Sequence, residues 1–111
     1  MPPPPPLAPV LVAAAFDAGQ MFVTLTFDRD VDPFNVAPEA ITVFDGSNAT
    51  EYRSTTDLGQ PNPTSVEILM LEAGEFTGSG VRMSAVAANG IVSAPGGIEW
   101  AGVADVGLPF P

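Results

Sequence analysis

The sequence predicts an all-β protein, an antiparallel β-sandwich of about seven strands. Turn residues, chiefly Gly, Pro, Asn and Asp, recur at short intervals, and the segments between them are rich in Val, Ile, Thr and Phe. In residues 21–27 the apolar Val23, Leu25 and Phe27 alternate with two threonines, which is the two-residue period of a strand with one buried face. No segment has the length and periodicity of a helix, and 111 residues suit a single domain.

The strands are expected at the apolar segments between the turns. Residues 10–16 form the first expected strand, and residues 21–27 form the clearest one. Residues 65–71 are apolar on both faces, which predicts a central place in a sheet or an interface. The other expected elements are a short strand at 40–44, an edge strand or loosely paired return at 49–55, a loop at 57–64, a connection at 72–80, a strand at 81–87 and a last strand at 98–108.

The two ends of the chain differ in character from the middle. Six of the 13 prolines fall within the first nine residues, and Pro2, Pro3, Pro4, Pro5 and Pro6 predict a stiff polyproline II segment. We therefore expect a Pro-rich N-terminal arm at residues 1–9, the sandwich at 10–108 and a C-terminal tail at 109–111. The arm is interpreted either as a lead-in to the first strand or as a segment that lies on a neighbouring subunit.

The composition excludes several kinds of chemistry. There are 13 acidic and three basic residues, a formal net charge of −10, and no His, Cys or Lys. Histidine relays, thiolate nucleophiles, Cys-based zinc sites and lysine Schiff bases are therefore impossible. The excess negative charge repels nucleic acid and anionic membrane surfaces, so neither is an expected partner. No Lys or Arg precedes Arg29, so we expect no secretory signal.

One acidic pattern is a weak candidate for calcium. Asp28, Asp30, Asp32 and Glu39 match acidic positions 1, 3, 5 and 12 of an EF-hand loop. However, Pro33 occupies the position that needs Gly, and the flanking segments are expected to be strands. We expect a solvated acidic loop, with no metal and no cofactor; calcium is the alternative.

Aromatic residues supply the candidates for protein contacts. Phe22 lies on the threonine face of its strand, whereas Phe34, Phe76 and Phe110 lie in expected loops or at the chain end. Each either caps the sandwich or anchors a subunit contact, where aromatic residues concentrate binding energy. Trp100 is expected in the core.

Three stretches resemble a known family. They are residues 23–32 (VTLTFDRDVD), residues 64–70 (TSVEILM) and residues 88–97 (ANGIVSAPGG). Together they are similar to the bacterial Ig-like repeats of S-layer, adhesin and other surface-repeat proteins. The resemblance implies an Ig-like fold and a binding or spacer module, normally one of many tandem copies.

A single copy without an expected export signal resembles the small structural proteins of tailed bacteriophages. We therefore expect a non-enzymatic virion component, made in the host cytoplasm, that decorates the capsid, the neck or a tail appendage. Its expected partners are other virion structural proteins, and it is expected to form a homo-oligomer or symmetric array. The alternative is an adhesion or spacer module of a bacterial cell surface, for which calcium is a weak candidate as a stabilising ion. A carbohydrate-binding role is a third hypothesis, with Trp100 and Tyr52 as the stacking residues.

Overall fold

The computed structural model describes residues 7–17, 21–46, 50–71 and 81–110. These residues form nine strands and no helix, so the predicted all-β class is confirmed. The strands are β1 (Leu11–Asp17), β2 (Phe22–Phe27), β3 (Val31–Asp32), β4 (Ile41–Asp45), β5 (Thr50–Gly59), β6 (Ser65–Leu71), β7 (Val81–Ala85), β8 (Val92–Ser93) and β9 (Val103–Gly107).

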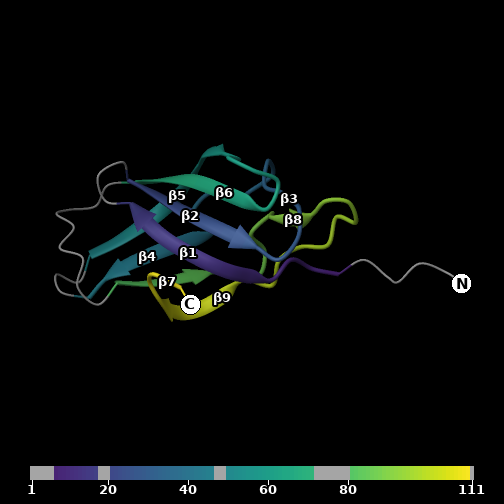
Figure 1. Cartoon of the computed structure of the whole chain (residues 1–111). Coiled ribbons are helices and arrows are strands. Elements are labelled where there is room, and N and C mark those ends of the chain that lie inside the picture. The colour runs from purple at the N-terminus through teal and green to yellow at the C-terminus, as the bar shows by residue number, and fades with distance from the viewer. Residues whose placement is uncertain (1–6, 18–20, 47–49, 72–80, 111) are drawn as a thin grey trace, which may run out of the picture.

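Seven of the strands form one curled antiparallel sheet (Figure 1), in the order β1-β2-β6-β5-β4-β7-β9. The two short strands β3 and β8 pair separately with each other. The segment after β9 returns to the other edge of the sheet, where Ala14 in the middle of β1 exchanges two backbone hydrogen bonds, of 2.9 and 2.8 Å, with Phe110.

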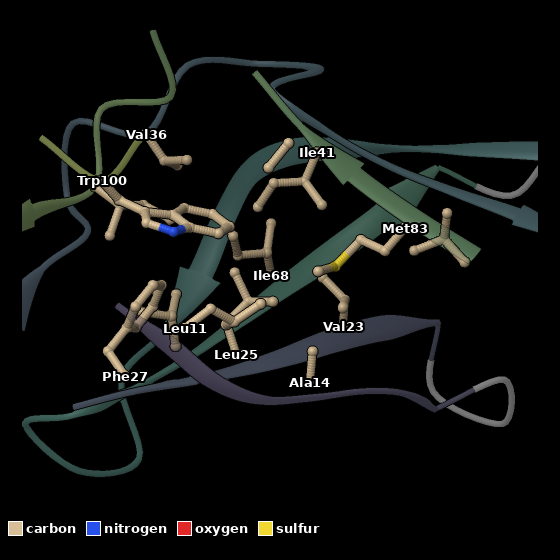
Figure 2. Packing of buried hydrophobic residues seen from close by; sticks show 14 of the residues in the cluster. Leu11, Ala14, Val23, Leu25, Phe27, Val36, Ile41, Ile68, Met83 and Trp100 are labelled. Atoms are coloured by element: carbon tan, nitrogen blue, oxygen red, sulfur yellow. The ribbon is translucent and has the colours of Figure 1, made fainter. Parts of the chain in front are cut away.

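The core lies inside this curled sheet and follows directly from the alternation in the strands. Val23, Leu25 and Phe27 on β2 are buried, as the sequence predicts, and the residues between them are half-buried on the outer face. Figure 2 shows that Trp100 packs beside Phe27; the rings meet edge to face, with centroids 5.1 Å apart. Trp100 is 3% exposed, so its predicted place in the core is confirmed.

Strand β6 agrees fully with its prediction. Its bounds are residues 65–71, and it lies between β2 and β5 near the middle of the sheet. Its inner face carries Val66, Ile68 and Met70, all buried. Its outer face carries Leu69, which is 39% exposed.

The prediction for β5 is wrong in two respects. The strand is an interior one, paired with β4 on one side and β6 on the other, and not an edge or a loose return. It also extends to Gly59, so residues 57–59 of the predicted loop belong to the strand. The physical reason is that Tyr52 and Ser54 alternate inward, where both are buried, and Ser54 accepts a hydrogen bond from the backbone N–H of Ile41.

The last strand begins five residues later than predicted. Residues 98–100 are held elsewhere: Glu99 forms a bridge to Val92, and the N–H of Trp100 donates to the carbonyl of Ile91. Gly102 then turns the chain with φ +80°, and its Cα lies so close to the Ala85 carbonyl that a Cβ would be only 2.2 Å away. The two-residue strands β3 and β8 were not predicted at all.

A buried asparagine ties the turns at one end of the sheet together. The Asn89 amide nitrogen donates to the carbonyls of Val86 (2.8 Å) and Trp100 (2.7 Å), and its oxygen accepts from the N–H of Ile91 (2.9 Å). Gly90 follows with φ +83°, and a Cβ there would lie 2.1 Å from the Asn35 carbonyl oxygen. The Asn-Gly pair is therefore required by hydrogen bonding at one residue and by close backbone approach at the next.

Candidate interaction surfaces

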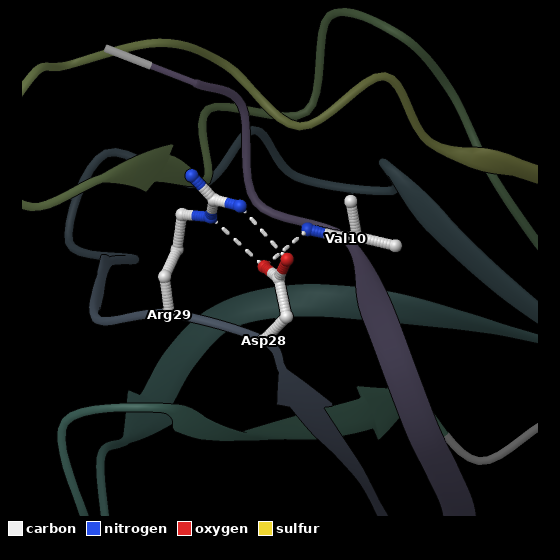
Figure 3. A network of polar contacts seen from close by, with 3 residues as sticks. All are labelled: Val10, Asp28 and Arg29. Carbon is white, nitrogen blue, oxygen red and sulfur yellow. Dashed lines mark hydrogen bonds and ion pairs between the residues drawn. The ribbon is translucent and has the colours of Figure 1, made fainter. Parts of the chain in front are cut away.

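Asp28, one of the weak calcium candidates, holds the start of β1 against the end of β2 (Figure 3). Its carboxylate accepts the N–H of Val10 (2.9 Å) and two hydrogen bonds from the Arg29 guanidinium (2.8 and 2.9 Å). Its own N–H donates to the Val10 carbonyl. The hydrogen bonds from Arg29, followed by the one from Val10, lower the pKa of Asp28 to about 2. Because β2 ends at Phe27, this carboxylate fixes where the N-terminal segment leaves the sheet.

The other three calcium candidates do not join Asp28. Asp32 accepts the N–H of Phe34 (3.0 Å), Glu39 lies 3.7 Å from the Arg53 guanidinium, and Asp30 is exposed. Within the described residues no three carboxylates come close enough together to hold a metal ion. Asp28, Asp32 and Glu39 are thus each engaged by a different neighbour, and Asp30 faces solvent.

The predicted aromatic contacts lie in different environments. Phe34 is 66% exposed, in the turn after β3. Phe22 is half-buried at the start of β2, and Phe110 packs against the core beside β1. Phe76 and the prolines at 2–6 lie outside the described residues. Phe34 and Phe22 therefore remain as aromatic candidates for contact with another protein.

Neither of the two residues expected to stack on a sugar lies at the surface. Tyr52 is fully buried and Trp100 is 3% exposed, so neither ring is open to a ligand. Tyr52 packs against Phe16, with ring centroids 5.5 Å apart. Both side chains are part of the core.

A shallow hollow lies on the outer side of the sheet across β2, β6 and β5. It measures about 250 Å³ and is lined by Phe22, Leu58, Gly59, Leu69 and two carboxylates, those of Asp57 and Glu67. The register places Phe22 of β2 directly opposite Leu69 of β6. Glu67, two residues along β6, pairs with Gly59 of β5. One feature of this surface is visible in the sequence, the apolar outer face of β6, whereas the residues of β2 and β5 that complete it are not.

A second hollow, of about 450 Å³, lies beside β3 and the loop that follows β5. Two of its polar side chains, those of Gln60 and Asn62, already have partners within the chain. Gln60 donates to the carbonyls of Val31 (2.8 Å) and Pro63 (3.1 Å), and the Asn62 carbonyl oxygen accepts from the N–H and hydroxyl of Thr64. These groups hold the loop in shape, which leaves the hollow over β6 as the better candidate site.

The electrostatics of the surface are set by the scarcity of cations. All three arginines of the chain are engaged in ion pairs: Arg29 with Asp28, Arg53 with Glu39 and Glu51, and Arg82 with Asp105. The ion pairs raise the pKa of Arg29 and of Arg53. Among the described residues, the exposed carboxylates of Asp30 and Asp57 belong to none of these ion pairs, so the outer surface is acidic where they lie.

No protein-family model matches the chain, and no curated protein or solved structure shows significant similarity to it. In the part of the chain that the structure describes, no helix is long and apolar enough to cross a lipid bilayer.

Proposed function

We propose that the chain is a non-enzymatic Ig-like module that acts through contacts with other proteins. The strand order supports the Ig-like part of this proposal. In Ig constant-type domains, strands A, B, E and D form one sheet and C, F and G the other. If β3 and β8 are left out, the chain order gives A to G as β1, β2, β4, β5, β6, β7 and β9, and the observed sheet order becomes A-B-E-D-C-F-G.

The observation that carries the contact role is the hollow across β2, β6 and β5. It measures about 250 Å³, and its lining combines apolar side chains, among them Phe22 and Leu69, which are paired across β2 and β6, with the carboxylates of Asp57 and Glu67. Small-molecule sites usually measure ~300 to 1,000 Å³ and enclose most of the ligand. A hollow of this size suits one side chain of a protein partner. Exposed Phe34, at a turn, adds a second apolar contact point.

We further propose that the protein assembles into the virion of a tailed bacteriophage, on the capsid surface, the neck or a tail appendage. The resemblance of its strands and turns to bacterial Ig-like repeats supports this role. The net charge of −10 also supports it, because such a surface is repelled by packaged DNA and suits an outward-facing position. The partners in this proposal are other virion structural proteins.

The test is quantitative mass spectrometry of purified particles from cells that express the gene together with its phage neighbours. The chain should be found at a copy number that follows capsid or neck symmetry, and antibody labelling should place it on the outside of the particle. Absence from particles, with recovery in the cell-surface fraction of the source bacterium, would refute the virion role and support the adhesion or spacer module.

A further inference from the structure

The hollow over β6 is produced by an irregularity in strand β5. Ser54 pairs with Met70 and Leu58 pairs with Ile68, so three residues of β5, at 55–57, lie opposite Leu69 alone. Such a bulge bends the strand and interrupts the ladder. The outer side of Leu69 is therefore left uncovered by β5, and 39% of its surface is exposed.

The bulge is fixed by a threonine. The Thr55 hydroxyl donates to the Leu69 carbonyl (2.9 Å) and accepts from the N–H of Asp57 (3.1 Å). These two bonds replace ladder bonds that the bulge removes, and they hold the Asp57 carboxylate at the rim. The hollow is thus a defined part of the fold, built on strands.

The rim carries negative charge that the chain itself does not neutralise. Asp57 and Glu67 belong to none of the ion pairs among the described residues. The chain has three basic side chains in all, and each is paired with carboxylates other than those of Asp57 and Glu67. A cation that approaches this rim must therefore come from another molecule.

On the basis of the proposed contact role, we infer that the hollow receives an apolar side chain that is flanked by Lys or Arg in a segment of a different protein. The apolar residue would pack on Phe22, Leu58 and Leu69, and its basic neighbours would face the carboxylates of the rim. A second copy of this chain is a poor occupant, because any arginine it offered would first have to leave its own ion pair.

The probe is a blocked heptapeptide with Lys-Phe-Lys at its centre, titrated into the ¹⁵N-labelled protein and followed by amide chemical shifts. We expect saturable shifts centred on Gly59 and Leu69. A peptide with Glu-Phe-Glu and one with Lys-Ser-Lys should each bind at least ~10-fold more weakly. Raising the ionic strength from about 0.01 to about 1 M shortens the screening length from ~30 to ~3 Å and should weaken the Lys-Phe-Lys peptide but not the Glu-Phe-Glu peptide.

A filling variant tests the location. A Cβ at Gly59 meets no atom within 4 Å, so Gly59→Leu should place a side chain in the hollow without disturbing the fold and should weaken the Lys-Phe-Lys peptide at least ~10-fold. Gly107 on β9 also has open space and lies outside the hollow, so Gly107→Leu is the matched control and should bind like the unchanged protein. Glu67→Gln should weaken binding, whereas Asp30→Asn, which removes one exposed charge elsewhere, should not.

Equal binding of the three peptides, no shifts at the hollow, or binding that survives Gly59→Leu would overturn the inference. Shifts that depend on protein concentration without peptide would indicate a second copy as the occupant and would also overturn it. Particle analysis separates this result from the proposed function. A chain present in particles with an inert hollow retains the virion role, and a peptide-binding chain absent from particles retains the hollow alone.

Discussion

Replacing Asn89 by Asp should reveal how much stability one buried amide provides. The two side chains have nearly the same shape, but the carboxylate has no N–H to donate. The Val86 and Trp100 carbonyls, now 2.8 and 2.7 Å from the amide nitrogen, would face an oxygen instead. The bond accepted from the N–H of Ile91 would be kept.

The expected loss is the sum of two unsatisfied buried carbonyls. Each costs about 1 to 3 kcal/mol, so Asn89→Asp should lower the free energy of unfolding by about 4 kcal/mol once the buried charge is included. With a typical urea m-value of ~2 kcal/mol/M, the unfolding midpoint should fall by about 2 M. A loss of this size is a large fraction of the ~5 to 15 kcal/mol that holds an ordinary domain folded.

The assay is equilibrium urea unfolding followed by the fluorescence of the single, buried Trp100. Asn35→Asp makes the same chemical change at an exposed position and should alter the midpoint very little. Burial should raise the pKa of the new carboxyl in the folded state above its unfolded value of ~3.9, so the deficit relative to the unchanged protein should grow as pH rises through the folded pKa. An Asn89→Asp protein within about 1 kcal/mol of the unchanged one would refute the reasoning.

Four further substitutions test other parts of the structure by the same unfolding assay. Gly90→Ala should cost about 3 kcal/mol or more, because the new Cβ would clash with the Asn35 carbonyl at a positive φ. Gly59→Ala has open space around the new Cβ and should be neutral or stabilising. Similar unfolding midpoints for the two variants would contradict this account. Asp28 has a lowered pKa, so its contribution to the free energy of unfolding should be present above pH ~4 and lost as pH falls toward about 2. Asp28→Asn should remove that part of the acid sensitivity. Parallel curves of unfolding midpoint against pH for the two proteins between pH 5 and 2 would disprove it. Thr55→Val keeps the shape but removes both bonds of the bulge, so it should cost about 0.5 to 1.5 kcal/mol, and an unchanged midpoint together with unchanged Leu69 amide exchange would count against the role of the hydroxyl.

Strands with a clear apolar period could be predicted from sequence, and β2 and β6 show why. Their inward residues are large and aliphatic, so the two-residue period is visible without any knowledge of the partners. In β5 the same period exists, but one inward residue is Ser54, whose burial depends on a hydrogen bond from Ile41 on the adjacent strand. In the sequence, a polar residue whose hydrogen-bond partner lies on another strand looks like a surface residue. The pattern of β5 therefore predicts an edge strand, although the strand is an interior one.

The hollow over β6 is even harder to predict from the sequence, because it depends on how β5 pairs with β6. The outward Leu69 could be recognised from the pattern of β6, but the hollow beside it exists because the register of β5 shifts between Ser54 and Leu58. That shift is a property of two strands together. The acidic residues after β2 show how far spacing can be interpreted: it matches a calcium loop, but Asp28 is bound by Val10 and Arg29, and no three carboxylates of the described residues come together.

The bridge between Ala14 and Phe110 limits how this protein can polymerise. An exposed edge strand is a template for adding another chain, and such growth has no built-in end. Here the middle of the outer edge of β1 already holds a backbone partner from the same molecule. That part of β1 is therefore closed to pairing with a strand of another chain.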